Sequence, residues 1–271
     1  YLILRDLFPQ WLVDTNILKK ESLAHKFLSI KEKQLYNCSD IIGIQSPSNL
    51  DYFKKKFHKE NYDLEVLYNW TKNDTIPRSK INFREKYNLI DKTIFVYAGN
   101  IGFAQDLMKI VRLAKNLINK TKIHFVIIGS GTEKDKIAKK IYKENISNIT
   151  MLDSVDEDDL LKILLECDIG IISLSNKLKT ENIPGKLLTY SRAGLPIIAS
   201  TNSLKDLKSM IQNSKCGYVI DNGSDKSLME LSLYFHNNPE LRKKYGKNSK
   251  MLLHKYFNVE LTVKQILNHI K

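Results

Sequence analysis

Long apolar runs and paired cysteines are both missing from this sequence of 271 residues. No apolar stretch approaches the roughly 18 to 20 residues that a membrane-spanning helix needs. The three cysteines, Cys38, Cys167 and Cys216, are far apart and form no CxxC pair, which disfavours a disulfide framework or a zinc site. The opening residues YLILRDLFPQ lack the basic flank and the cleavage site of a secretory signal. We therefore expect a cytoplasmic protein that keeps its thiols reduced and binds no metal.

Acidic side chains are in the minority, because 30 Asp and Glu stand against 43 Lys and Arg, a formal net charge of +13. This balance favours an anionic partner: a nucleic acid, a phospholipid headgroup or a phosphorylated small molecule. A general compositional preference for Lys, Asn and Ile would also raise the lysine count without any function. The sequence has no RNP, KH, zinc or helix-turn-helix signature. We therefore expect no nucleic-acid partner.

From about residue 94 onward, short β-branched segments alternate with longer amphipathic ones. Each short segment has the length and continuous apolar character of a strand covered on both faces. The alternation implies parallel pairing through right-handed crossovers, and hence a doubly wound, Rossmann-like α/β fold. The predicted strands cover Ile94–Ala98, His124–Ile128, Asn148–Leu152, Asp168–Ser173, Pro196–Ser200 and Gly217–Ile220, and helices are expected near 107–118, 133–144, 157–166, 186–193, 203–213 and 225–236.

The first 75 residues have a sparser pattern that we interpret as the remnant of an incomplete N-terminal lobe. They are expected to be too few for an independent parallel sheet. The polar stretch at 71–82 is typical of a linker. We predict three parts: the acceptor-side remnant at 1–75, a nucleotide-binding domain at 76–250, and a C-terminal helix at 251–271 that packs back toward the first lobe. Within the remnant, helices are expected at 21–37 and Pro47–Lys59, and strands at Ile41–Ser46 and Glu65–Asn69.

Glycine-containing turns follow two neighbouring predicted strands. Gly99 and Gly102 follow the first strand, and Gly129 and Gly131 follow the second. Ligands of doubly wound sheets bind at the carboxyl ends of the strands. Glycine lets the backbone approach a phosphate, and a helix N-terminus offers amides and a positive dipole end. Either turn alone would equally serve tight strand-to-helix packing, but the two together favour an anion pocket.

A polar loop carrying Glu181 leads into Pro184-Gly185-Lys186 at the start of a short predicted helix, which ends at a glycine C-cap, Gly194. A lysine in the first turn of a helix opposes the helix dipole, so this position is unfavourable unless the lysine reaches an anion. The alternative is an ordinary solvated lysine. We interpret Lys186 as a phosphate-binding residue.

Four segments follow one another along the chain: RDLFPQ (5–10), YNWTK (68–72), GNIGFAQDL (99–107) and IPGKLLTYSRAGLPIIAS (183–200). They resemble, in order, the R-D-x-W-P-E loop, the P-N-W-x-D segment, the G-N-x-G-x-x-Q turn and the x-P-S-K-x-x-E-Y-x-A-x-G-x-P-V signature of family 4 glycosyltransferases. These are two-lobed, GT-B enzymes, and the resemblance is to their bacterial branch for capsule and O-antigen polysaccharides. The resemblance implies a further segment before the first motif, which would carry the catalytic histidine. We therefore expect no turnover by these residues alone.

The resemblance also implies the reaction. A sugar would leave a nucleoside diphosphate, with a UDP-sugar favoured, and would be transferred with retention of configuration and without a metal or other cofactor. Backbone amides and basic side chains would neutralise the departing diphosphate. By resemblance, Glu181 is the catalytic carboxylate; Gly99, Asn100, Gly102, Gln105, Gly185 and Lys186 face the diphosphate; and Gly129, Asp153, Val155 and Thr189 face the nucleobase and ribose.

Some positions depart from the family pattern. Thr189 stands where the second carboxylate of an E-x7-E pair is expected, and its single hydroxyl is a poorer partner for two ribose hydroxyls. Asn100 and Gln105 stand where many members carry an Arg and a Lys. For Glu181, an ordinary loop carboxylate is the alternative. These departures imply either a divergent donor or weakened catalysis.

The segment Ser48–Lys59 is a predicted basic helix whose Leu50, Phe53 and Phe57 share one face. By resemblance, the first lobe faces a membrane that holds a lipid-linked or glycan acceptor. Such a helix would suit anionic headgroups at the inner face of the plasma membrane. The alternative is a core helix with a solvated basic face.

Two other functions fit parts of the sequence. A GT-B sugar-nucleotide epimerase would share the fold and the donor pocket. It would need several acidic and histidine catalysts, however, and Glu181 is the one candidate, because His25 and His58 lie on helices that look peripheral. A non-catalytic nucleotide-binding subunit that works with a separate acceptor-binding chain is the second alternative.

Overall fold

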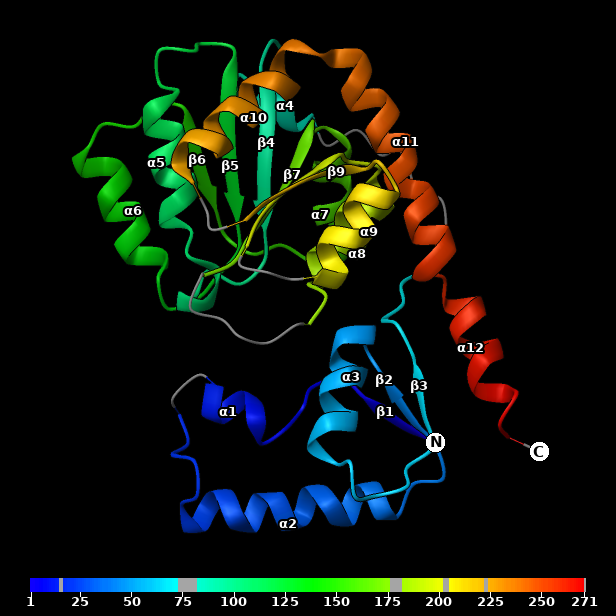
Figure 1. The fold of residues 1–271 in the computed structure, drawn as a ribbon. Helices are drawn as coiled ribbons and strands as arrows, with labels where there is room; N and C mark the ends of the chain where they lie inside the picture. Colours follow the sequence, from blue (N-terminus) through cyan, green and yellow to red (C-terminus); the bar gives the residue numbers. More distant parts are fainter. Residues whose placement is uncertain (15–16, 73–81, 176–181, 202–204, 222–223, 271) are drawn as a thin grey trace.

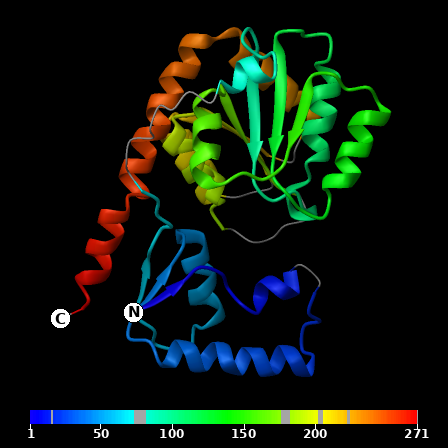
Figure 2. The same cartoon turned by 180° about the vertical axis from the view of Figure 1, so that it is seen from behind.

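The computed structural model of the protein describes residues 1–14, 17–72, 82–175, 182–201, 205–221 and 224–270. The chain forms two lobes, each built around a parallel sheet (Figure 1). The carboxyl ends of the strands in the larger sheet face the smaller lobe, as the view from behind also shows (Figure 2). The turns that the sequence marks as ligand-binding therefore lie on the side of the larger lobe nearest the smaller one.

The smaller lobe has its own three-stranded parallel sheet, in the order β1-β2-β3. The expectation that these residues are too few for such a sheet is wrong, because the apolar run at the start of the chain supplies β1 as a third strand. Tyr36, Phe53 and Phe57 pack with Ile42 and Ile44 of β2 to form its core. The strands are β1 (Leu2–Leu4), β2 (Ile42–Ile44) and β3 (Leu64–Val66), and the helices are α1 (Gln10–Asp14), α2 (Leu23–Asn37) and α3 (Pro47–Lys56).

Helix α3 is the basic helix predicted from the sequence, and it ends at Lys56 rather than Lys59. The aromatic side chains that the sequence placed on its apolar face are not available to a membrane, because Phe53 is 0% exposed and Phe57, just after the helix, is 7% exposed. Lys56 pairs with the buried carboxylate of Glu32 at 2.9 Å. The structure thus favours the alternative of a core helix whose lysines face solvent.

The larger lobe has a six-stranded parallel sheet in the order β6-β5-β4-β7-β8-β9. All six predicted strands are confirmed, each to within one residue at either end. The chain runs outward from β4 to β6 and then returns to the other side of β4 with β7. The strand order therefore reverses between β4 and β7, which is where doubly wound sheets open a crevice for ligands. The strands are β4 (Thr93–Ala98), β5 (Ile123–Ile128), β6 (Ile149–Leu152), β7 (Ile169–Ser173), β8 (Ile197–Thr201) and β9 (Gly217–Asp221).

Helices cover both faces of this sheet, which accounts for the continuous apolar runs of its strands. Along β4, Phe95 and Tyr97 belong to one core cluster, whereas Ile94 and Val96 belong to the other. Helices α5 (Met108–Asn116), α6 (Lys134–Lys143) and α10 (Asp225–Asn237) contribute to the first cluster, and α4 (Phe83–Lys86), α7 (Glu157–Leu165), α8 (Gly185–Ala193), α9 (Lys205–Asn213) and α11 (Pro239–Tyr256) contribute to the second.

The C-terminal helices connect the lobes (Figure 1). The predicted boundary at residue 251 falls inside the continuous helix α11, and the one near residue 75 lies outside the described residues. Helix α12 (Val259–Leu267) lies against the smaller lobe, where the Gln265 side chain donates a hydrogen bond to the Val66 carbonyl at 2.9 Å. Over the described ranges, no helix has both the length and the apolar character to cross a bilayer.

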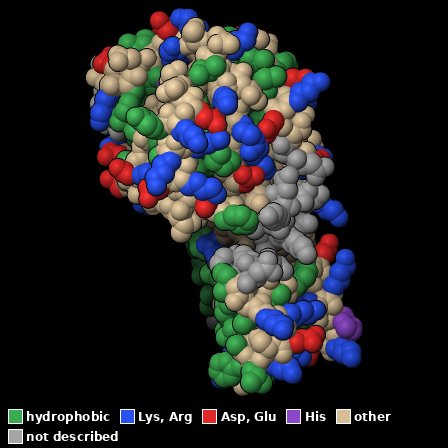
Figure 3. All heavy atoms as spheres, turned by 90° about the vertical axis from the view of Figure 1, so that its left-hand side faces the viewer, with side chains coloured by type: hydrophobic (Ala, Val, Ile, Leu, Met, Phe, Trp, Pro, Cys, Tyr) green, Lys and Arg blue, Asp and Glu red, His purple; other side chains and the backbone are tan. Residues whose placement is uncertain are grey.

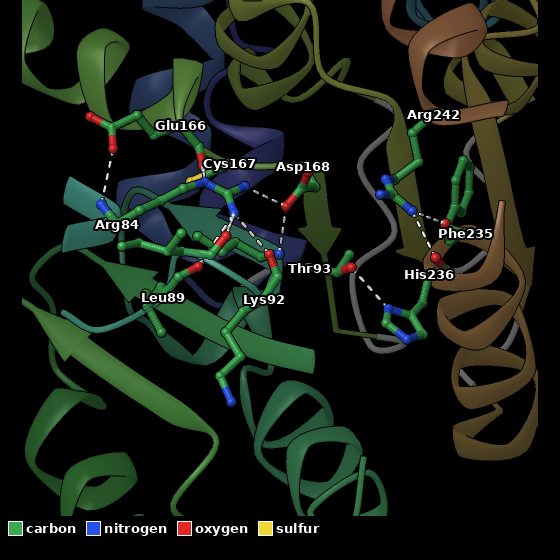
Figure 4. Close-up of polar contacts among 12 residues, drawn as sticks. Arg84, Leu89, Lys92, Thr93, Glu166, Cys167, Asp168, Phe235, His236 and Arg242 are labelled. Atoms are coloured by element: carbon green, nitrogen blue, oxygen red, sulfur yellow. Dashed lines mark hydrogen bonds and ion pairs between the residues drawn. The ribbon is translucent and has the colours of Figure 1, made fainter. Parts of the chain in front are cut away.

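A guanidinium clamp fixes the start of the larger lobe at the end of the sheet where the strands begin, opposite their carboxyl ends (Figure 4). Arg84 of α4 donates to the Glu166 carbonyl at 2.7 Å, to the Lys92 carbonyl at 2.8 Å and to the Asp168 carboxylate at 2.7 Å. The same Asp168 oxygen accepts the Ile94 amide at 2.8 Å. The clamp therefore ties α4 to the first residues of β4 and β7.

Candidate functional site

The turns after β4 and β5 pack backbone to backbone. Gly129 has φ 152°, and a Cβ atom there would lie 1.9 Å from the Gly99 carbonyl oxygen. Gly131 has φ 149°, and its Cβ would lie 2.4 Å from the Ile101 oxygen. Residues other than glycine are excluded at both positions, because the positive φ angle is strained for them and their Cβ atom would clash with the neighbouring carbonyl oxygen. Gly129 is buried in this contact, so its position explains the packing of the two turns.

Lys186 lies over the turn that follows β4. Its Nζ atom is 4.8 Å from the centre of the Tyr97 ring, and a Cβ atom on Gly99 would approach it to 3.0 Å. Burial lowers the pKa of Lys186 to about 8. In the described part of the chain, no carboxylate pairs with this ammonium group. A partly buried cation that lies over a glycine turn and has no counter-ion in the described ranges is suited to binding an anion.

Most backbone amides of the β4 turn are already used within the fold. The Gly99 amide donates to the Ile128 carbonyl at 2.9 Å, and the Ile101 amide donates to the Ser130 carbonyl at 2.7 Å. The Gly102 amide donates to Gln105 Oε1 at 3.1 Å, so the Gln105 side chain is turned into its own turn. The Gly99 and Gly102 amides, which the sequence suggested as donors to an anion, are therefore already hydrogen-bonded within the protein.

The remaining donors are the Asn100 amide and the first turn of α8. Within the described ranges, the Asn100 amide has no acceptor. Helix α8 begins at Gly185 after Pro184, and no side chain caps it. Space is open beside Gly185, where a Cβ atom would meet nothing within 4 Å. Free amides at a helix N-terminus bind anions readily, so Asn100, Gly185 and Lys186 form the candidate anion site.

Tyrosines that the sequence analysis missed hold this site in place. The Tyr190 hydroxyl accepts the Ala98 amide at 2.9 Å and donates to the Ile171 carbonyl at 3.1 Å, so it links α8 to both β4 and β7. The Tyr97 hydroxyl donates to the Asn100 carbonyl at 2.5 Å. One sequence signal was present: Gly170 inside a strand, where a Cβ would lie 2.5 Å from the Tyr190 ring, because such glycines mark close approaches.

The residues expected at the nucleobase and ribose are more dispersed. Thr189 is half-buried in α8, one turn after Lys186, and its hydroxyl donates to the Gly185 carbonyl at 3.4 Å. Asp153 and Val155 are exposed after β6, the edge strand that β5 separates from β4. Asp153 forms an ion pair with Lys134. Glu181, the expected catalytic carboxylate, lies outside the described residues.

The segment that follows β7 is attached to the β4 turn. The Ser175 amide donates to the Ala104 carbonyl at 2.8 Å. Lys109 is 3% exposed and donates to the Leu174 carbonyl at 2.8 Å, and burial lowers the pKa of this lysine. The turn after β4 and the first residues after β7, Leu174 and Ser175, are therefore held together at the point where the strand order reverses.

On the face of the molecule in Figure 3, basic and acidic side chains are interspersed over the larger lobe. Among the residues that the structure describes, no three His, Cys, Asp or Glu side chains gather closely enough to hold a metal ion.

Comparison with known proteins gives a consistent family. Residues 79–251 match the family model of the Glycosyl transferases group 1. The probable glycosyltransferase WbjE of Pseudomonas aeruginosa is 23% identical over 220 residues, which cover 80% of this chain and 54% of WbjE. The chain thus spans about half the length of this relative.

Solved structures show the same two-lobed GT-B fold. A mutant of S. aureus TarM, in complex with Fondaparinux, alpha-GlcNAc-glycerol and UDP, has a TM-score of 0.70 and 16% identity; the match covers 91% of this chain and 46% of TarM. Anabaena HepE in complex with UDP-glucose has a TM-score of 0.73 and 12% identity; the match covers 98% of this chain and 70% of HepE. At such identities the likeness establishes the fold alone.

Proposed function

Because the chain belongs to the group 1 glycosyl transferases, we propose that it binds the donor of a sugar-transfer reaction. The donor is a nucleoside diphosphate sugar, with a UDP-sugar favoured, and the acceptor is a lipid-linked or polysaccharide chain. Transfer proceeds with retention of configuration. Family 4 membership and a role in capsule or O-antigen synthesis are the finer parts of this proposal, and they are supported by the order of the four motifs.

The position of Lys186 is the observation that carries the proposal. Lys186 belongs to the first turn of α8, and its ammonium group lies over the Gly99 turn at the strand reversal between β4 and β7. A diphosphate placed there would receive charge-assisted hydrogen bonds from Lys186 and hydrogen bonds from the uncapped amides of α8. These groups would stabilise the negative charge that develops as the sugar departs, without a metal ion. TarM and HepE, with the same fold, were solved in complex with UDP and UDP-glucose, which supports uridine as the base.

Other parts of the proposal rest on the resemblance. Glu181, which precedes α8 in the sequence, would act on the sugar, and Thr189 would contact the ribose with one hydroxyl in place of a carboxylate. The protein would work in the cytoplasm, against the inner face of the plasma membrane where a lipid-linked acceptor is held. A non-catalytic nucleotide-binding subunit remains the second candidate, because the Thr189 hydroxyl is already bonded to the Gly185 carbonyl.

Thermal-shift measurements with UDP, GDP, ADP and dTDP test the donor. A ligand that binds the folded state at 100 times its Kd adds about 2.7 kcal/mol of stability, which is a rise in Tm of about 5 °C or more for a domain of this size. We expect this rise with UDP and smaller ones with the other nucleotides. Unchanged Tm values with all four would refute the donor assignment. Release of UDP from a UDP-sugar by these residues would exclude the second candidate, because a non-catalytic subunit binds UDP but transfers no sugar.

A further inference from the structure

Three hydrogen bonds join the smaller lobe to the larger one beside the candidate site. In α3, the Asn49 side chain donates to Asn182 Oδ1 at 2.6 Å. Asn182 Nδ2 in turn donates to Asp6 Oδ1 at 2.8 Å. The third bond runs from the Ser48 amide to the carboxylate of Asp206, in α9, at 2.8 Å. The start of α3 accordingly faces the larger lobe (Figure 1).

Asn182 is the central residue of this group. It follows Glu181 and precedes Lys186, in the first turn of α8, by four residues. Both ends of its amide are used, since its oxygen accepts from Asn49 and its nitrogen donates to Asp6. This pairing fixes the orientation of the side chain and, with the buried Ile183, the path of the backbone into α8.

Both partners of Asn182 come from the smaller lobe. Asn49 is 5% exposed, so loss of its acceptor would leave a buried polar group without a partner. Asp6 lies in the RDLFPQ loop, just after β1. Among the described residues, neither Asp6 nor Asn49 bonds to Lys186, and both bond to Asn182, which precedes it in sequence.

We propose that Asp6 and Asn49 are positioning residues of the donor site. They hold Asn182 when the two lobes are in contact, and through it they set the position of the backbone that leads into α8 and Lys186. The donor site of the larger lobe is therefore complete when the smaller lobe is docked. This inference rests on the proposed function, because it takes Lys186 to be a donor-binding residue.

An exchange of charge tests the contact between Asp6 and Asn182. Asn182→Asp places a second carboxylate at 2.8 Å from the first, and the repulsion should separate the two side chains. Adding Asp6→Asn restores a donor and an acceptor, so the double variant should recover. Asp6→Asn alone should stay close to wild type, because the new amide oxygen still accepts from Asn182. Asn61→Asp, in an exposed loop, is the control for added charge.

Two measurements on the full chain are needed. Fluorescence transfer between a label on exposed Cys38 and one on Lys139→Cys of α6 reports the distance between the lobes; the other cysteines are buried. Calorimetry gives the Kd for UDP. We expect Asn182→Asp to change the distance and to weaken UDP binding at least about fivefold, and the double variant to restore both.

The outcomes separate the inference from the proposed function. If Asn182→Asp leaves both the distance and the UDP affinity at wild-type values, the positioning role is refuted. If Asp6→Asn fails to rescue it while Tm shows a folded protein, the specific contact is refuted. A wild-type chain that binds no UDP would refute the proposed function, whereas the lobe distance would still show whether the three contacts hold the lobes together.

Discussion

At the scale of single residues, Lys186 is a partly buried lysine that pairs with no carboxylate among the described residues. Its pKa is lowered to about 8 because burial disfavours the charged form. The free protein therefore holds this lysine as a cation below about pH 8 and loses the charge as the pH rises further. A diphosphate favours the cation, so the affinity for UDP should fall as the pH rises through this value.

We expect the Kd for UDP to increase about tenfold between pH 7 and pH 9 in the wild type, since one charge-assisted contact contributes roughly 1.5–3 kcal/mol. Lys186→Gln should bind about tenfold more weakly at pH 7 and should show a flat profile above it. Calorimetry at several pH values measures both. Lys143→Gln, exposed at the end of α6, is the matched control and should keep the wild-type profile. A pH dependence that persists in Lys186→Gln would assign the titration to another group.

At the scale of elements, the short helix α4 depends on the Arg84 clamp. Four residues cannot form a stable helix alone, and the Glu166 carboxylate accepts the first two amides of α4, at Phe83 and Arg84. Arg84→Met should destabilise the larger lobe by about 3 kcal/mol, because several carbonyls and the Asp168 carboxylate lose their donor. Urea unfolding measures this loss. Lys86→Met, exposed on the same helix, should change stability by less than about 0.5 kcal/mol. Equal effects of the two substitutions would contradict the clamp.

At the scale of the whole molecule, His124 links stability to pH. It lies in β5, 9% exposed, with Nε2 at 2.8 Å from the Thr150 hydroxyl. Burial, with a smaller effect of Lys92, lowers its pKa to about 4. Between about pH 6.5 and pH 4 the unfolded chain binds a proton that the folded chain does not, so stability is complete above pH 6.5 and is lost as the pH falls.

The loss attributable to His124 should reach up to about 3 kcal/mol at pH 4. Urea unfolding at pH 7, 5.5 and 4.5 tests this, and His124→Gln should reduce the slope. Part of the slope should remain, because burial also lowers the pKa of His236, which bonds to Thr93 at 2.8 Å. His254→Gln, exposed on α11, is the control. An unchanged slope in His124→Gln would exclude His124 as the source.

The sequence by itself determined the larger lobe. Continuous apolar runs identified all six strands, because a strand that is buried on both faces consists of consecutive apolar residues. The alternation of these strands with helices implied their parallel pairing. It also placed Lys186 at a helix start. Two strands of the small sheet were also predicted, at Ile41–Ser46 and Glu65–Asn69, but the sheet was not expected because β1, a strand of three residues, was not counted as the third.

Tertiary structure decided which hydrogen-bond donors of the anion site remain free for a ligand and which residues hold the site in position. The amides of Gly99, Ile101 and Gly102 are consumed by contacts within and between turns, and local spacing says nothing about such pairing. Asn49 and Asp6 meet Asn182 across 133 and 176 residues of sequence. Contacts of this kind depend on how the two folded lobes pack against each other. The residues next to a polar side chain in the sequence do not indicate which distant residue it will contact.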